Sequence, residues 1–363
     1  MYLRYIYKLH DLHISADNYN EAALTLQLHA SQLAWNNTTH PADGHHSPQM
    51  EWQRKEALYL TIIDYFDRGK CWEKGIPLCK ELAQFYEQRL YDFAKLSAIL
   101  RRQAEFYDHI LTQLRPEPEY FRVGFYGQGL PLFLRNKVFI YRGLEYERIG
   151  AFTQRLQTEF PSAHVLTKNT PPADSILSSE HQYIQICNVK SLPEDHPVFD
   201  TNLNLSEKIR CYYRVNDVHR FQLDRPVHKG PVDRDNEFKS LWIERTLLVT
   251  ENKLPGILRW FEVIEQHIQE IPPVQFACET VASVNKELQQ LALLHKAEPR
   301  RNINPFTMRL QGVIDANVMG GIAKYQVLSS LLLLLPLPIF QNQQLNNLTR
   351  RKLLKLSYSV AWN

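Results

Sequence analysis

The residue types that carry covalent chemistry occur in this sequence, but they are not grouped as in known catalytic sites. No Gly-x-Ser-x-Gly, His-Glu-x-x-His or Walker sequence is present in the 363 residues. His45 and His46 are adjacent, but no cysteine or acidic residue stands at a spacing typical of metal ligands, which favours a solvated loop. Gly124, Gly127 and Gly129 have the spacing of a weak phosphate-binding motif, but they lack a strand-then-helix context and favour backbone turns. The sequence therefore predicts neither covalent catalysis nor a bound metal or cofactor.

The cysteines and one charged pair also favour structural roles. The five cysteines are odd in number, dispersed and never in a Cys-x-x-Cys pair, which argues against a disulfide framework and fits a reducing compartment. Glu244 and Arg245 lie within a strand-like pattern, and we expect a structural pair rather than an acid–base couple. The cysteines are Cys71, Cys79, Cys187, Cys211 and Cys278.

Residues 315–321 have the sequence Asp-Ala-Asn-Val-Met-Gly-Gly, which a helix interior would not favour. Asp and Asn favour helix caps, and each glycine inside a helix costs about 1 kcal/mol relative to alanine. One interpretation is a helix broken by a flexible insert, with Val318 and Met319 at an apolar tip and Gly320 and Gly321 behind it. The other interpretation, which the spacing alone favours, is an ordinary helix end with a glycine stop.

The elements before this insert begin with helices. Asp17 has the properties of a helix cap, and helices are predicted over residues 51–67 and 74–90. A longer helix follows, because apolar residues from Phe93 to Leu114 recur at steps of three and four. No 34-residue self-repeat is found, so a repeat array is not predicted.

The middle of the chain changes to the patterns of strands. Residues rich in β-branched and aromatic side chains alternate with turn residues, and one helix is predicted near residues 147–159. A tight hairpin is expected at residues 214–218. The predicted strands are 138–141, 183–189, 209–215, 218–223 and 241–250, and together they predict a compact antiparallel β domain.

Helical patterns return near the carboxyl end. We expect a helix after Leu254, with Ile257, Trp260, Phe261 and Ile264 on one face. A regular seam helix is predicted from residue 274, and residues 304–305 are expected to start the helix that leads to the insert. The predicted fold class is therefore α+β.

Composition excludes some classes of partner. The net charge of +3 is too small for a general nucleic-acid binder, and no motif for nucleic acid is visible. The start of the chain lacks the apolar core of a signal peptide. A leucine-rich run at residues 331–335 is shorter than the roughly 20 residues that a membrane span needs, so we expect membrane contact to be peripheral at most.

A series of short motifs in chain order resembles the DOCKER domain, the second DOCK homology region, of DOCK-family guanine nucleotide exchange factors. The resemblance is strongest to the subgroups that act on Rac, and it extends from the first residues to about residue 326. Each motif alone is modest, but their ordered occurrence is specific. The motifs are at residues 4–9, 17–19, 21–23, 124–129, 138–143, 145–148, 236–238, 242–246, 253–263, 303–305 and 318–321.

The resemblance implies three lobes and a non-covalent exchange activity. Lobe A (residues 1–118) would be a dimerising helical array, lobe B (119–252) an antiparallel β domain, and lobe C (253–326) a helical bundle. Val318 would be the nucleotide sensor that displaces magnesium from a Rac-like small GTPase. Such a protein would act in small-GTPase signalling to the cytoskeleton and in cell migration, in the cytoplasm and with recruitment to the plasma membrane. The residues expected to bind the GTPase or shape the insert are Asp315, Asn317, Met319, Gly320, Gly321, Ile271, Pro273, Asn304 and Met308.

Two departures from the family pattern leave an alternative function open. The family commonly has Ile-Ser-Pro where this chain has Ile-Pro-Pro at residues 271–273. After residue 326 the chain diverges, so we expect residues 327–363 to be an alternative or aberrant end and lobe C to be incomplete. The alternative is therefore a truncated, non-catalytic dimerising scaffold that binds partners without exchange.

Overall fold

The computed structural model describes residues 2–41, 47–194, 206–230, 240–297, 300 and 302–314. Internal contacts divide the chain into two compact units. The first unit comprises Met1–Leu223 and Thr246–His267. The second comprises Asp224–Arg245 and Ile268–Asn363. The predicted tail, residues 327–363, lies outside the described residues.

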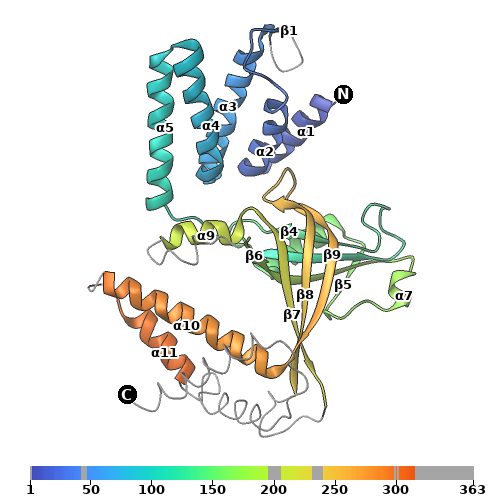
Figure 1. Ribbon diagram of the computed structural model, residues 1–363. Helices are drawn as coiled ribbons and strands as arrows, with labels where there is room; N and C mark the ends of the chain where they lie inside the picture. The colour runs from blue at the N-terminus through green and yellow to red at the C-terminus, as the bar shows by residue number, and fades with distance from the viewer. Residues whose placement is uncertain are drawn as a thin grey trace, which may run out of the picture. The chain divides into compact units, whose positions relative to one another are not determined.

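The amino-terminal part of the first unit is an array of helices, in which each α-helix packs against the next along the chain (Figure 1). Large side chains such as Phe66, Trp72 and Phe106 fill its core. The predicted helical lobe is confirmed. Its elements are α1 (Tyr2–Ser15), α2 (Tyr19–Ala30), the short strands β1 (Thr39–His40) and β2 (Gln49–Met50), α3 (Glu51–Arg68), α4 (Trp72–Phe85), a π-helical turn (Tyr86–Leu90) and α5 (Phe93–Thr112).

The turn before α2 differs from the prediction. Asn18 directly precedes the helix, whereas Asp17 has a φ of 54° in the left-handed region. Asp is one of the few residue types that tolerate this conformation. The Asp17 carboxylate accepts a hydrogen bond from the Tyr19 hydroxyl at 2.8 Å. The prediction that Asp17 caps the helix is therefore wrong.

Helix α5 presents two different apolar faces. Its buried face consists of Ile99, Phe106 and Ile110, which join the core of the array. The stripe that the sequence indicated is mostly on the other face and is exposed to between 44% and 64% at its large side chains. Those side chains are Phe93, Leu100, Tyr107 and Leu111. The periodicity identified the helix correctly, but most of this stripe is not core.

A mixed, mainly antiparallel sheet follows the array. Its strand order is β3-β4-β9-β8-β7-β6-β5, and β3 also pairs with β6, so the order closes on itself. Only the pairing of β5 with β6 is recorded as parallel among the strands described. The strands are β3 (Tyr120–Tyr126), β4 (Lys137–Arg142), β5 (Ala163–Leu166), β6 (Gln182–Leu192), β7 (Val218–His228), β8 (Leu241–Leu254) and β9 (Trp260–Ile271).

Side chains alternate across the strands to form two apolar clusters. Tyr120 and Phe121 are neighbours in β3, yet they belong to separate clusters because successive side chains point to opposite faces. Phe121 stacks on Phe152 of α6 (Ile149–Glu159) with ring centroids 4.3 Å apart. The predicted β domain and its helix near residues 147–159 are confirmed.

Residues 209–215 were predicted as a strand, and that prediction is wrong. They belong to helix α9 (Glu207–Val215), which contacts α5 and β6. Ile209, Tyr212 and Tyr213 are spaced three and four residues apart and pack against the core of the helical array. The predicted hairpin at residues 214–218 is accordingly the junction between α9 and β7.

The helix expected after Leu254 is also absent, because these residues form part of the sheet. Trp260 and Phe261 begin β9 and lie opposite Tyr141 and Ile140 of β4. Their apolar spacing fits a helix as well as a strand, and the pairing with β4 decides between them. Gly124, which was predicted to mark a turn, lies inside β3, whereas Gly127 has a φ of 98° and does form a turn.

The described part of the second unit contains the distal segments of β7, β8 and β9 and two helices. These are α10 (Pro273–Ala297) and α11 (Asn304–Ile314), as the sequence predicted. The α+β fold class is thus confirmed. Within the described ranges, no helix has the length and apolar character required to cross a membrane.

Candidate functional site

The segment leading into the predicted insert is a pair of contacting helices. Helix α11 ends at Ile314, one residue before the insert begins. The insert residues themselves lie outside the part of the chain that the structure describes. They are Asp315, Asn317, Val318, Met319, Gly320 and Gly321. The structure therefore describes the helices that precede the predicted insert in the chain.

Helices α10 and α11 pack together and are joined by an ion pair. Arg309 of α11 donates through Nε and Nη2 to Glu287 Oε2 of α10 at 2.9 and 2.7 Å. Both side chains are partly exposed, so the pair contributes about 0–1 kcal/mol and chiefly fixes the relative register of the helices. Val284, in the middle of the predicted seam, is buried.

The junction between β9 and α10 holds two predicted site residues. Ile271 ends the strand and is 1% exposed, so its side chain packs in the interior. Pro273 is the first residue of α10, a position at which the missing amide hydrogen has no intrahelical partner to lose. The carbonyl of Pro272 accepts a hydrogen bond from the Phe276 amide at 3.1 Å, which closes the first turn. These residues set where α10 starts.

The other two predicted site residues are at the start of α11. The Asn304 amide donates to Asn302 Oδ1 at 2.9 Å, which satisfies one of the free donors at this helix end. Met308 lies one turn further on and is 74% exposed. An exposed methionine can adapt to a partner's apolar surface, because its side chain is flexible and polarisable.

Arg245 of β8 links the strands to α10. Its Nε and Nη2 donate to the two carboxylate oxygens of Asp224 in β7 at 2.9 and 3.0 Å. Its Nη1 lies 2.8 Å from Glu279 Oε2 of α10. Hydrogen bonding to Asp224, with a further contribution from Glu279, raises the pKa of Arg245. One guanidinium therefore connects two strands and the helix that supports α11.

Neighbouring charges in the same strands form further pairs. Glu244 accepts a bidentate hydrogen bond from Arg225 of β7, with distances between 2.8 and 3.2 Å. Glu244 and Arg245 do not pair with each other, because adjacent strand residues point to opposite faces. The prediction that Glu244 and Arg245 form a structural pair is therefore wrong, and each instead pairs with a side chain of β7. Lys229 lies 2.6 Å from Glu270 and 5.0 Å from the Trp242 ring centroid.

Within the described ranges, no cluster of three or more His, Cys, Asp or Glu side chains could hold a metal ion. What these residues form is a framework of ion pairs and packed helices.

Comparison with known families identifies the lobes. The model for DHR-2 lobe A matches residues 1–112, and the model for DHR-2 lobe B matches residues 169–253. The chain belongs to the DOCK family. The matches fall on the helical array and on the β region of this DHR-2 domain, and they confirm the family predicted from the sequence motifs.

Curated relatives agree with this assignment. The DHR-2 chain is 49% identical to dedicator of cytokinesis protein 3 of Mus musculus over 327 residues, which is 90% of this chain and 16% of the relative. It is 47% identical to human dedicator of cytokinesis protein 4 over 326 residues, again 90% of this chain and 16% of the relative. Identity to the DOCK-like protein 1 of Saccharomyces cerevisiae is 27% over 342 residues, covering 90% of this chain and 17% of that protein. The chain thus spans about a sixth of the length of these relatives.

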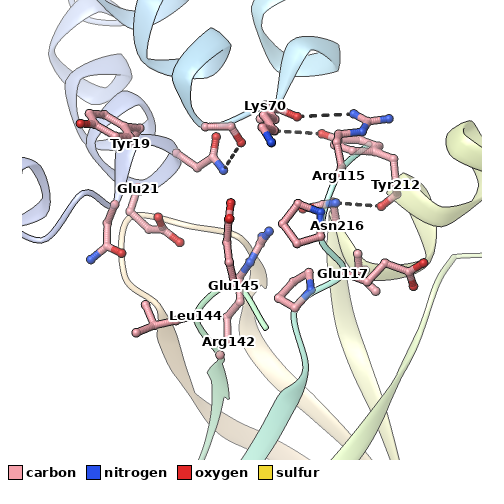
Figure 2. Close-up of a pocket in the computed structure, with 18 of the residues that line it drawn as sticks. Tyr19, Glu21, Lys70, Arg115, Glu117, Arg142, Leu144, Glu145, Tyr212 and Asn216 are labelled. Atoms are coloured by element: carbon pink, nitrogen blue, oxygen red, sulfur yellow. Dashed lines mark hydrogen bonds between the residues drawn. The ribbon is translucent and has the colours of Figure 1, made fainter. Parts of the chain in front are cut away.

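Sequence reasoning missed a cavity in the first unit of the DHR-2 domain (Figure 2). Its volume is about 690 Å³, and its walls come from the turns of the helical array, the end of β4 and helix α9. Arg259 Nη1 donates to Glu21 Oε1 at 3.1 Å and to Asn18 Oδ1 at 3.0 Å beside it. Burial lowers the pKa of Arg259. No sequence signal marks this cavity, because its walls come from segments far apart in the chain.

Proposed function

We propose that this chain is the exchange module of a guanine nucleotide exchange factor that promotes GDP release from a Rac-like, Rho-family small GTPase. Membership of the DOCK family through both DHR-2 lobes is the observation that carries the proposal. The helices α10 and α11 add support, since they lead directly into the segment that resembles the family's nucleotide-sensor insert.

The proposed mechanism is steric and electrostatic. Val318 enters the nucleotide site of the GTPase and displaces the magnesium ion that neutralises the phosphates. Binding to the GTPase thereby weakens its hold on GDP, and by linkage nucleotide equally weakens the hold of the exchange factor. Gly320 and Gly321 let the insert leave the helix and approach closely, while Asp315 and Asn317 shape it.

The residues around the insert have supporting roles in this proposal. Met319 packs beside Val318 at the tip. Met308 contacts the GTPase, for which its exposed, flexible side chain is suited. Asn304 sets the start of α11, and the buried Ile271 with Pro273 sets the start of α10.

We further propose that two copies of the chain associate through the exposed stripe of α5. The stripe is formed by Phe93, Leu100, Tyr107 and Leu111, which are four to seven residues apart and therefore share one face. Large exposed apolar faces of this kind typically mark protein interfaces. Dimerisation is expected for both the exchange factor and a scaffold, so it does not distinguish them. Action in the cytoplasm with peripheral recruitment to the plasma membrane belongs to the same proposal.

The test is release of fluorescent GDP from magnesium-loaded Rac by the purified chain and by Val318→Ala. We expect acceleration by the chain, and a loss of at least tenfold in that acceleration with Val318→Ala at unchanged Rac binding. Leu111→Asp is a matched control, because it should convert the dimer to a monomer in light scattering without touching the insert. A soluble chain that binds Rac without accelerating release would refute the exchange proposal and support the scaffold.

A further inference from the structure

Two side chains that line the cavity of the first unit each have a polar atom that is buried without a hydrogen-bond partner among the described residues. The two atoms are Arg142 Nη1 and Asn20 Oδ1. The Arg142 atom is a charged donor and the Asn20 atom is an acceptor. A ligand would therefore need an acceptor group for Arg142 and a donor group for Asn20. Buried polar atoms of folded proteins are nearly always paired, which makes this combination within one cavity informative.

Of the two side chains, Arg142 has the larger free-energy cost of burial, because it is charged. It ends β4 and is 9% exposed, and an arginine cannot relieve its burial by losing a proton. The nearest acidic side chain to consider is Glu21, which is 2% exposed, but Glu21 already bonds to Arg259 at 3.1 Å. Arg142 also interacts electrostatically with Glu21, so these three side chains together carry two positive charges and one negative charge. Figure 2 shows the labelled side chains of Arg142 and Glu21 at the cavity.

Several other charged side chains of the lining are already engaged or offset one another. Among the cations, Arg115 is engaged by Glu73 at 2.6 Å. Among the acids, Glu117 and Glu207 are exposed and lie 3.6 and 2.7 Å from Arg214. Lys70 and Glu145 also line the cavity, and their opposite charges offset each other. Asp17, Arg68 and Lys208 complete the charged lining, which in all holds six basic and five acidic side chains and so has a formal excess of one positive charge.

Asn20 is oriented by its other amide atom. Its Nδ2 donates to the carbonyl of Gly69 at 2.9 Å, which fixes Oδ1 as the unpaired acceptor. The Asn20 side chain lies so close to the backbone at position 69 that this position requires a glycine, because a Cβ on Gly69 would lie 2.2 Å from Asn20 Oδ1. The acceptor is therefore held in place by the turn between α3 and α4.

We propose that this cavity binds a small oxyanion, a phosphate or carboxylate group, against Arg142, and that a hydroxyl or amine of the same ligand donates to Asn20. The volume of about 690 Å³ lies within the range of about 300–1,000 Å³ typical of small-molecule sites. Its walls include the turns of the helical array and the end of a sheet strand, so the bound ligand stabilises the contact between them. This site is separate from the proposed exchange activity and does not depend on it.

The first test measures thermal unfolding of the full chain with inorganic phosphate or with acetate, at constant ionic strength. A saturable rise in the midpoint of about 2–4 °C is expected with at least one anion, and the anion that gives it identifies the class. Arg142→Gln should abolish the rise. Arg148→Gln is the matched control, because Arg148 is an exposed cation that pairs with Glu119 outside the cavity, and it should retain the rise. No rise, or an equal rise in all three proteins, overturns the proposal.

A second measurement does not depend on folding of the Arg142 variant. Crystals of the wild-type chain are soaked in selenate, whose anomalous scattering locates the ion directly. A peak within hydrogen-bond distance of Arg142 Nη1 supports the site. Peaks confined to other surfaces of the chain overturn it.

Discussion

Replacing Arg245 with methionine should loosen helix α10 from the strands while leaving the strands paired. Methionine keeps much of the length of the side chain but removes the donors to Asp224 and Glu279. Arg225→Met is the matched control, because Arg225 makes a similar bidentate pair with Glu244 between the same two strands, whereas Glu279 of α10 pairs with Arg245.

The size of the effect follows from the exposure of the partners. The side chain of Arg245 is 16% exposed and that of Glu279 39%, so their contact lies between an exposed ion pair and a buried charge-assisted hydrogen bond. We therefore expect loss of about 1 kcal/mol from the docking of α10. A change of 1 kcal/mol multiplies the opening equilibrium by about five.

Amide hydrogen exchange measures the local opening equilibrium of α10 directly. Exchange in the first half of α10 should become about fivefold faster in Arg245→Met and in Glu279→Gln. It should be unchanged in Arg225→Met, in which only the amides of β7 and β8 respond. Unaltered protection of α10 in Arg245→Met, or equal loss in Arg225→Met, would refute the idea that Arg245 holds this helix.

Two other perturbations test the first unit. Burial acts to raise the pKa of Glu147, but hydrogen bonds from Arg155 and a backbone amide outweigh it, so the pKa lies below 4.5. This contribution to stability is fully present above pH 4.5 and is lost as the pH falls through the folded-state value. Arg155→Gln should therefore lower the free energy of unfolding by about 1–3 kcal/mol in urea at pH 7, with a difference that shrinks below pH 4.5 and not above it. Gly75→Ala in α4 should lower the free energy of unfolding by about 1–3 kcal/mol, because the added Cβ would lie 2.5 Å from Phe106. Gly150→Ala in α6 is the matched control: its Cβ would meet nothing within 4 Å, so it should raise the free energy of unfolding by about 0.5–1 kcal/mol. Urea unfolding measures both.

Local sequence patterns predicted the elements whose contacts are also local. The helices over residues 51–67 and from residue 274 were found because their periodicity is long and regular. Residues 209–215 were misjudged because tyrosines and β-branched residues favour strands, while contact with the distant helical array selects a helix. Residues 260–264 were misjudged in the opposite sense, since only pairing with β4 distinguishes the strand.

The site could be predicted only where it is contiguous in sequence. The run of residues 315–321 and the helix starts at Pro273 and Asn304 are local features, so they were visible from the sequence. The contact between Arg245 and Glu279 joins residues 34 positions apart, and the cavity beside Arg142 joins segments from residue 16 to residue 259. Without the fold, no spacing rule connects these residues.

The pairing of β4 with β9 has a consequence for how the protein is made. Phe139 lies opposite Glu262, so the sheet cannot be completed until β9 has left the ribosome. The helices of residues 2–112 pack against their neighbours in sequence and can assemble much earlier. Before β9 is synthesised, Arg259 cannot yet donate to Glu21. The Glu21 carboxylate of the folded helical array therefore remains hydrated until then. A stall in translation between these two points should therefore leave a folded amino-terminal array attached to unpaired strands, which is the stage at which the chain is most exposed to aggregation.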